Sequence, residues 1–397
     1  MQITEVTPLL ADGGWAPYAY VKVATNAGIT GYGECTDWRM PYALTGAVRD
    51  LGQALEGKNA LDIPARMLEM QKLTEQSPGG ISQRAIAGIE LALIDVKGKA
   101  YQVPAYDLIG GKVRDRVRLY WSHCGTYRAR WADFLGTPPL RTYDDIEALG
   151  REVVDRGYTA LKTNILVPGD PPWTQITEVR ESIKPTIERA RTQLEAFKRG
   201  AGDDFDTALD INFWFTTQEA IRIAEGLEDL HMLWLEVDSF EPDSIRQITD
   251  STSLTICSAE SVNTYRDYKR FLDIRAMDVA MFDLPWAGMA ESLAIAAQAK
   301  VQELDVAPHN YYSHLATFMS GHLCATLPHL KIMETDVDAC PLRELYVTEQ
   351  PKIEDGYLVV SDAPGWGTDL DEAAIAANPW RGSKVGTWDD ILKRKAR

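Results

Sequence analysis

The chain has few basic residues for its size. Of 397 residues, 41 are Lys or Arg and 58 are Asp or Glu, which leaves a formal net charge of −17. A surface this acidic repels a phosphate backbone, and no long basic stretch occurs apart from the terminal run KRKAR. We therefore expect no nucleic-acid partner and interpret the basic run as a solvated chain end.

Long apolar runs and paired cysteines are also missing. No stretch approaches the roughly 18 apolar residues that a membrane helix needs, and the beginning, MQITEVTPLL, has neither a charged leader nor a cleavage pattern. The five cysteines are scattered, without C-x-x-C spacing. These absences predict a soluble cytoplasmic protein without a membrane partner, whose reduced thiols mainly pack in the interior.

The first part of the chain predicts a small α+β domain. The segments YAYVKVATNAG and ITGYGEC flank the turn residues Asn26 and Gly28, which is typical of an antiparallel hairpin. Apolar residues at three- and four-residue steps then predict three helices, at 43–56, 61–75 and 81–102. Pro104 and a glycine pair end the last helix, so we place this domain at residues 1–118.

The remaining chain alternates short β-branched segments with amphipathic helices. The expected strands are 117–122, 159–163, 206–211, 232–237, 254–258, 278–282, 304–308 and 330–334. The expected helices are 142–156, 176–200, 217–229, 241–250, 262–272, 287–302 and 312–327. Eight such βα units predict an α/β fold, a TIM-type (β/α) barrel over 119–344. Residues 345–397 are expected to pack back on the N-terminal domain, which would cap the barrel.

Polar side chains follow the predicted strands, where the chemistry of such barrels lies. From strand two to strand eight they are Lys162, Asp210, Glu236, Glu260, Asp283, His309 and Glu334. Three carboxylates on successive strands should face a shared point, and they cannot all stay ionised without a cation. Hard oxygen ligands in this number suit Mg²⁺. Each acid alone is better explained as a solvated strand end or a helix cap, but the run over three strands favours a metal site.

Asp283 and His309 end neighbouring strands. The aspartate can accept from one ring nitrogen and raise the basicity of the other, which predicts a catalytic dyad. Taken singly, His309 is also compatible with a structural role, and Asp283 with a cap of the next helix. Of the remaining histidines, His123 at the end of the first strand is expected to line the pocket, and the others are expected to be structural.

With these residues at its predicted strand ends, the sequence resembles the mandelate racemase branch of the enolase superfamily over essentially its whole length. Further matching motifs are GYGE at 31–34, LIGGKVRDRV at 108–117 and LKT at the end of strand two. The resemblance implies the following site: Asp210, Glu236 and Glu260 as metal ligands, Asp283 and His309 as the dyad, and Glu334 as the acid beside the substrate carboxylate. It also implies that capping-domain loops at 15–18 and 36–41 close over the substrate.

The chemistry implied by the resemblance is removal of the proton next to a carboxylate, through an enediolate. Mg²⁺, Lys162 and a protonated Glu334 would stabilise the enediolate, and His309 would take the proton. The same imidazolium could then protonate a neighbouring hydroxyl that leaves as water. We therefore expect a Mg²⁺-dependent acid-sugar dehydratase, a carbon–oxygen lyase that forms a 2-keto-3-deoxy acid and assembles as a homo-oligomer. A racemase, epimerase or cycloisomerase of the same superfamily is the first alternative.

Other enzyme classes fit less well. A glycoside hydrolase with Glu236 and Glu334 as its two carboxylates also fits a barrel, but it leaves Asp210, Glu260 and the dyad without roles. A metal-dependent amidohydrolase would be expected to carry H-x-H on its first strand, and the sequence has none. A non-catalytic binding barrel would need neither a base nor a metal in its pocket.

Three features depart from the branch. The second lysine of the common Lys-x-Lys end of strand two is Asn164, whose amide cannot shuttle a proton. This predicts one-sided chemistry by His309 and disfavours racemisation. The connection 164–205 is unusually long, and Gly288-Met289 replaces a glycine pair. No lysine ends strand six, which argues against the muconate lactonizing branch.

Substrate contacts are expected from polar and aromatic groups near the mouth of the barrel. The candidates are Asn164, Asn212, Arg39, Trp38, Tyr18, Trp15 and Trp286. Arg39 and Asn212 are the preferred ones among them, since several tryptophans could simply fill the core.

Overall fold

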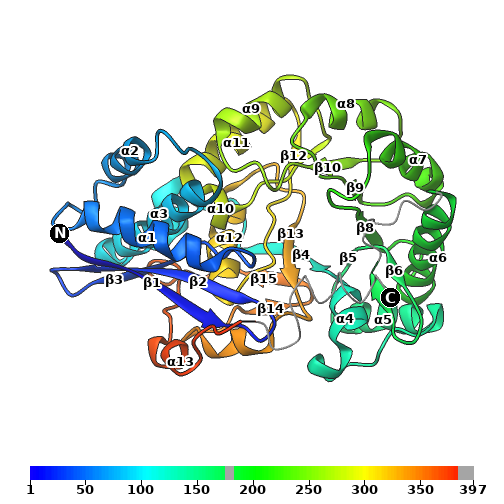
Figure 1. Ribbon diagram of the computed structural model, residues 1–397, viewed down its shortest axis with the longest axis horizontal. Coiled ribbons are helices and arrows are strands. Elements are labelled where there is room, and N and C mark those ends of the chain that lie inside the picture. Colours follow the sequence, from blue (N-terminus) through cyan, green and yellow to red (C-terminus); the bar gives the residue numbers. More distant parts are fainter. Residues whose placement is uncertain (175–182, 383–397) are drawn as a thin grey trace.

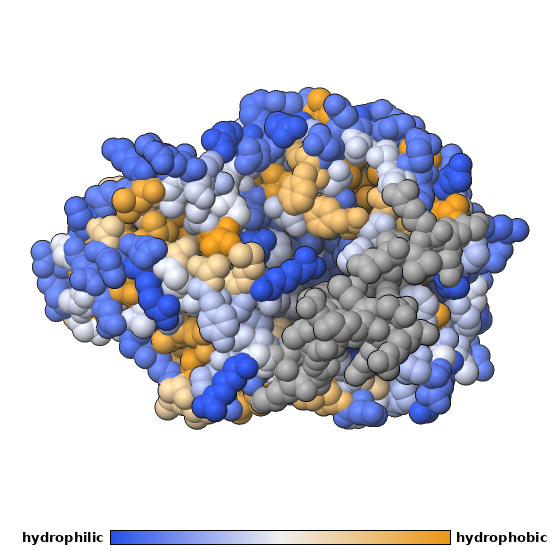
Figure 2. All heavy atoms as spheres, in the orientation of Figure 1, coloured by the Kyte–Doolittle hydropathy of each residue, from blue (hydrophilic) through white to orange (hydrophobic). Residues whose placement is uncertain are grey.

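The computed structural model describes residues 1–174 and 183–382. The N-terminal capping domain and the barrel lie side by side, with the capping domain at the left of Figure 1. In the same orientation, Figure 2 shows hydrophilic side chains over most of the rim and apolar ones in separate patches. Across the described ranges, every helix is too short or too polar to span a lipid bilayer. The basic run at 393–397 and the beginning of the helix expected at 176–200 lie outside the described residues.

The capping domain is an antiparallel sheet packed against helices. Its strands are β1 (Ile3–Asp12), β2 (Pro17–Thr25) and β3 (Thr30–Glu34), paired in that order. Its helices are α1 (Pro41–Leu55), α2 (Ile63–Leu73) and α3 (Gly80–Tyr101), each within two residues of the prediction. The β2–β3 hairpin is the predicted one. The pattern does not indicate β1, because Pro8 and the apolar run after it break strict alternation.

The GYGE motif lies where β3 touches α3. A Cβ on Gly33 would stand 2.3 Å from the carbonyl oxygen of Gly88, and a Cβ on Gly31 would stand 2.3 Å from that of Ala92. Glycine is therefore required at both positions for the helix to lie this close to the strand. The last residue of the motif, Glu34, is buried and accepts hydrogen bonds from the backbone amides of Ser313 and Ala316, at the beginning of a barrel helix.

The barrel is confirmed strand by strand in the described part of the chain. Its strands are β4 (Arg116–Ser122), β5 (Ala160–Thr163), β8 (Asp206–Asp210), β9 (Trp234–Glu236), β10 (Ile256–Ser258), β11 (Val279–Ala280), β12 (Asp305–Val306) and β13 (Met333–Asp336). Consecutive strands pair in parallel from β4 to β12, and β13 pairs in parallel with β4. A parallel bridge between Val306 and Leu330 closes the ring.

The predicted helices cover the outside of the barrel (Figure 1). They are α5 (Tyr143–Asp155), α6 (Ile183–Ala201), α7 (Thr217–Leu227), α8 (Pro242–Asp250), α9 (Tyr265–Asp273), α11 (Met289–Val301) and α12 (His314–Thr326). Elements that the sequence does not indicate are α4 (Thr126–Leu135), β6 (Leu166–Val167), β7 (Trp173–Thr174), α10 (Leu284–Ala287) and three 3₁₀ turns, η1 (Ala105–Ile109), η2 (Glu228–Leu230) and η3 (Pro341–Leu345). Most of these are too short to produce a periodic pattern.

The C-terminal segment contacts both parts of the molecule. Strands β14 (Ile353–Glu354) and β15 (Tyr357–Val359) form a hairpin, and β15 pairs antiparallel with β4. Helix α13 (Glu372–Ala377) packs against β1. The Glu372 carboxylate also accepts hydrogen bonds from Lys22 and Tyr32, both at 2.7 Å. This segment thus touches the capping domain. It also extends the sheet at β4, which the sequence does not indicate.

Helix α3 holds the barrel segment that follows Asp283. Gln83 donates Nε2 to the carbonyl oxygen of Ala287 at 2.7 Å. The buried Glu90 carboxylate accepts from the backbone amides of Met289 at 2.9 Å and Ala290 at 3.0 Å. These amides begin α11, where a negative charge is favourable, although burial raises the pKa of Glu90 to about 7.

We expect Glu90→Ala to destabilise the protein by about 1–3 kcal/mol, because two buried amide donors lose their acceptor. Glu90→Gln keeps an acceptor of the same size and should cost less. Urea unfolding of the parent and both variants measures the difference. Equal stability of Glu90→Ala and the parent would show that this contact between the domains contributes nothing.

Candidate active site

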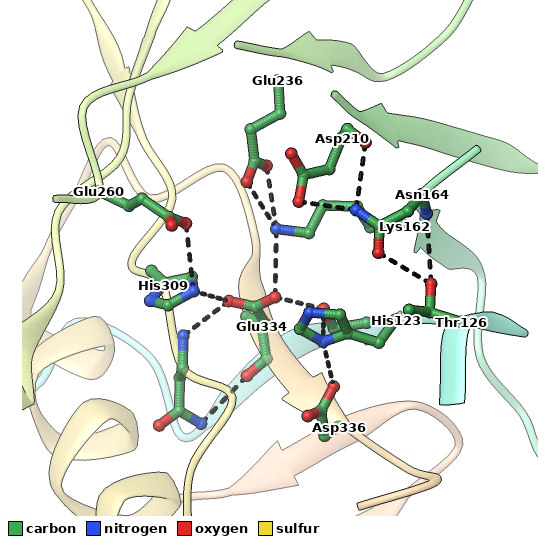
Figure 3. A network of polar contacts seen from close by, with 12 residues as sticks. His123, Thr126, Lys162, Asn164, Asp210, Glu236, Glu260, His309, Glu334 and Asp336 are labelled. Carbon is green, nitrogen blue, oxygen red and sulfur yellow. Dashed lines mark hydrogen bonds and ion pairs between the residues drawn. The ribbon is translucent and has the colours of Figure 1, made fainter. Parts of the chain in front are cut away.

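The strand-end side chains converge at one end of the barrel (Figure 3). Lys162 is the central cation among them. Its Nζ lies 2.8 Å from Oε1 of Glu236 and 3.2 Å from Oε1 of Glu334. Burial disfavours the ammonium, but these two carboxylates outweigh it and hold the pKa of Lys162 well above its ordinary value. Lys162 is therefore a permanent cation, suited to stabilise negative charge and unsuited to act as a base.

The predicted metal ligands end successive strands: Asp210 ends β8, Glu236 ends β9, and Glu260 follows β10. Within residues 1–174 and 183–382, no three acidic, His or Cys side chains are grouped closely enough to enclose a metal ion. Glu236 is turned toward Lys162, and Oε2 of Glu260 lies 3.1 Å from Nε2 of His309. The acids thus lie in one region, and Lys162 and His309 lie between them.

A fourth carboxylate, missed by the sequence reasoning, belongs to the same group. Asp238 is 6% exposed, and neither of its oxygens has a hydrogen-bond partner among the described residues. Burial, and then the charges of Glu260, Asp210 and Glu236, raise its pKa well above the ordinary value. Its position two residues after Glu236 was the available signal, because alternate strand residues share a face.

The acid group carries more negative charge than its neighbours neutralise. Burial raises the pKa of Glu236 to about 8, and although Lys162 opposes the rise, the charges of Asp210 and Glu260 add to it. Unsatisfied carboxylate oxygens in a buried, like-charged group suit a hard divalent cation. The residues present therefore fit Mg²⁺ in the chemistry of their donor atoms.

Asp283 and His309 lie together as the expected dyad. Nδ1 of His309 is 2.6 Å from Oδ2 of Asp283, which also accepts a hydrogen bond from Tyr312. On the other side of the ring, Nε2 lies 3.1 Å from Glu260 and 3.6 Å from Glu334. Burial disfavours the imidazolium, but the charges of Glu260, Glu334 and Asp283 outweigh it and raise the pKa of His309 to about 10. The dyad thus presents an unusually basic nitrogen to the other site residues.

The charges around Glu334 favour its ionised form, against the expectation of a protonated acid. Its Oε1 accepts a hydrogen bond from Ser122 and lies 3.2 Å from Nζ of Lys162. Burial opposes its charge, but Lys162, His309 and His123 outweigh burial and hold the pKa of Glu334 well below its ordinary value. The sequence could not reveal this, because the three bases come from three other strands or loops.

A second histidine–aspartate pair lies on the opposite side of Glu334 from His309 (Figure 3). Nδ1 of His123, just after β4, is 2.9 Å from Oδ1 of Asp336, at the end of β13. The His123 ring stacks on Tyr127, with centroids 4.7 Å apart, and the Tyr127 hydroxyl donates to Asp336 at 3.1 Å. Sequence analysis places His123 at the pocket but misses Asp336, because the last strand continues two residues beyond its predicted end.

The two asparagines proposed as substrate contacts hold Asp210. Asn164 donates Nδ2 to Oδ2 of Asp210 at 3.1 Å, and its Oδ1 accepts from Thr126 at 2.9 Å. Asn212 donates Nδ2 to the same Asp210 oxygen at 2.8 Å. Both amides therefore orient a proposed metal ligand.

Two of the aromatic candidates lie close to the dyad. The Trp286 ring is 5.7 Å from that of His309, and its Nε1 donates to a carbonyl oxygen of the capping domain. Trp38 packs edge-on against Tyr311, with centroids 4.6 Å apart. Arg39 is exposed at the surface beside Trp38.

The other two aromatic candidates are core residues. Trp15 stacks on Trp131 at 4.8 Å between centroids. Tyr18 is fully buried and packs against Tyr20 and Tyr346, with centroids 6.2 and 6.4 Å away. The structure therefore does not bring Tyr18 to the strand-end cluster.

Comparison with known proteins covers nearly the whole chain. Residues 11–110 match the family described as mandelate racemase / muconate lactonizing enzyme, N-terminal domain. Residues 145–374 match the family described as enolase C-terminal domain-like. The two matches coincide with the capping domain and with most of the barrel.

Individual relatives agree with these matches. D-xylonate dehydratase of Haloferax volcanii is 33% identical over 97% of this chain and 90% of its own. D-gluconate dehydratase of Thermoproteus tenax is 27% identical over 94% of this chain and 73% of its own. A Burkholderia xenovorans protein, provisionally assigned as an L-alanine-DL-glutamate epimerase and bound to magnesium and fumarate, is 34% identical, with a TM-score of 0.91 over 98% of this chain and 99% of that one.

Proposed function

The chain belongs to the enolase superfamily, in its mandelate racemase branch, and on this premise we propose that it dehydrates an acid sugar to a 2-keto-3-deoxy acid. It is a carbon–oxygen lyase. The sugar-acid dehydratases among its relatives support this substrate class. The observation that carries the proposal is the Asp283–His309 dyad, whose second ring nitrogen, Nε2, lies 3.1 Å from Glu260 and 3.6 Å from Glu334.

His309 would remove the proton next to the substrate carboxylate from its neutral form, which the charges of Glu260 and Glu334 disfavour and which binding of a cation by Glu260 would restore. Asp283 holds Nδ1 and supports the imidazolium that forms, so that Nε2 is the atom that receives the proton. Trp286 and Tyr312 pack against the ring and keep it in one orientation. Several hydrogen bonds and aromatic contacts therefore fix the base before substrate arrives, which lowers the cost of reaching the transition state.

The enediolate needs positive charge beside its two carboxylate oxygens. Lys162 supplies a buried ammonium, and the ionised Glu334 holds that ammonium in place. Asp210, Glu236 and Glu260 would hold Mg²⁺, with Asp238 alongside. Bound Mg²⁺ supplies electrostatic stabilisation of the developing negative charge.

Epimerisation is the second candidate, favoured by the provisional assignment of the Burkholderia structure. An epimerase needs a base on each face of the planar enediolate. Asn164 occupies the position of the second lysine, its amide cannot carry a proton, and its Nδ2 is bonded to Asp210. The chain therefore favours elimination over inversion.

We also propose that the enzyme works in the cytoplasm as a homo-oligomer. All five cysteines are buried and free of disulfides, as expected in a reducing compartment. Light scattering of the purified protein measures the mass of the assembly.

Removal of divalent metal should abolish turnover, and Mg²⁺ should restore it. The parent protein is incubated with a panel of aldonic and aldaric acids, and 2-keto acid is measured before chelation, after chelation and after Mg²⁺ addition. The expected result is Mg²⁺-dependent product from at least one acid sugar. Full activity after complete chelation would contradict the proposal and return attention to a glycoside hydrolase.

A further inference from the structure

Glu334 is flanked by two histidine–aspartate pairs that come from opposite sides of the barrel mouth. His309 with Asp283 lies on one side, and His123 with Asp336 on the other (Figure 3). The Tyr311 ring is near both histidines, with its centroid 4.7 Å from that of His309 and 5.9 Å from that of His123. Both imidazoles therefore lie beside Glu334 and near the same tyrosine ring. The proposed function uses one of them.

The surroundings of His123 are those of an oriented, accessible side chain. Its side chain is 20% exposed, whereas that of Asp336 is 1% exposed. Its backbone has φ of 47°, in the left-handed region that a histidine seldom adopts, and the Tyr127 stack fixes the ring. Strain of this kind persists where surrounding contacts hold a side chain in one required position.

The two ring nitrogens of His123 differ in their partners. Nδ1 lies 2.9 Å from Asp336 and 3.3 Å from the Ser122 hydroxyl, which leaves Nε2 as the nitrogen that can face a substrate. In the imidazolium form, Nδ1–H donates to Asp336 and leaves Nε2–H for a group of the substrate. Dehydration requires such a donor, because hydroxide is a poor leaving group until it is protonated.

We propose that His123 is the acid that protonates the departing hydroxyl, a role that rests on the proposed dehydration. His309 takes the C2 proton, and the electrons of the C2–H bond enter the enediolate. These electrons then form the C2=C3 bond as the C3–O bond breaks, and the oxygen takes the Nε2 proton of His123 and leaves as water. The resulting enol loses its C2 hydroxyl proton to solvent and gains a proton at C3 to become the 2-keto-3-deoxy acid, while His309 releases its proton to solvent and solvent returns one to His123.

With His309 as base and His123 as acid on opposite sides of Glu334, the proposal predicts anti elimination. A single histidine that removes the C2 proton and protonates the leaving group would act from one face and give syn elimination. Asn164 cannot take the place of the acid, because its amide has no transferable proton. Asp336 is then a positioning residue, which acts only through His123.

The test is His123→Asn, measured with the acid sugar that the parent dehydrates and with its 3-deoxy-3-fluoro analogue. Fluoride leaves without being protonated, so loss of a general acid should spare its elimination. We expect dehydration to fall by about 10²–10⁴-fold, while fluoride release and exchange of the C2 proton in D₂O stay near parental rates. Asp336→Asn should slow dehydration less and also spare fluoride release. His231→Asn is the matched control, because His231 is exposed and precedes β9, at the opposite end of that strand from Glu236.

Loss of fluoride release and C2 exchange together with dehydration would show that His123 is structural and would overturn the assignment. Dehydration at the parental rate in His123→Asn would overturn it as well. A parent that dehydrates no acid sugar is a different result, since it contradicts the proposed function before any variant is made.

Discussion

His309→Asn should lose turnover by about 10²–10⁴-fold and should also lose exchange of the substrate's C2 proton. Asparagine keeps a polar group of similar reach but cannot accept a proton at neutral pH. The fold should persist, because the barrel interior is an apolar core that does not depend on the site. Steady-state kinetics and exchange in D₂O measure the two losses, and calorimetry should show that Mg²⁺ still binds.

Asp283→Asn tests the second residue of the dyad. It removes the charge beside Nδ1 but leaves the imidazole, so its loss of activity should be smaller than that of His309→Asn. Near-parental activity of His309→Asn would show that this histidine is structural and would make Lys162 the next base to examine. The buried carboxylates that hold Lys162 as a cation argue against that outcome.

Glu236→Gln should abolish turnover and weaken Mg²⁺ binding. The loss of affinity should exceed the roughly 10–100-fold typical of substituting a residue that only orients a metal ligand. The amide is nearly isosteric, so packing is kept while one anionic oxygen pair is lost. The free energy of unfolding should be little changed, because the site acids repel one another and contribute little to the stability of the fold.

Calorimetric titration with Mg²⁺ alone tests this prediction. Glu241→Gln is a suitable control, because Glu241 is exposed and follows the same strand. A Glu236→Gln protein that binds Mg²⁺ as tightly as the parent would remove Glu236 from the ligand set.

The barrel was predictable because its signals are local. Each short apolar segment, such as that ending at Glu236, is followed by a helix with its own apolar period. Strands as short as β11 and β12 were still found, since the spacing of the units continues through them. The pairing of β15 with β4 was not predictable, because it joins segments more than 200 residues apart without a periodic signal.

The residues of the site were predictable from the sequence, but their protonation states were not. Parallel strands bring their ends together, so Lys162 and Glu236 could be placed in one region from the sequence. That Glu334 is ionised depends on Lys162, His309 and His123 surrounding it, and these are tertiary contacts that no spacing encodes. Asp238 was missed for a similar reason, since its significance lies in oxygens left without partners.

The most direct test of one-sided proton abstraction followed by elimination is NMR of the parent enzyme in D₂O with the acid sugar that it dehydrates. The account predicts that 2-keto-3-deoxy product accumulates while recovered substrate shows little inversion at C2, because Asn164 provides no base beside C2 and His123 is assigned to the hydroxyl at C3. Rapid appearance of the C2 epimer carrying deuterium would contradict it and would identify the reaction as epimerisation.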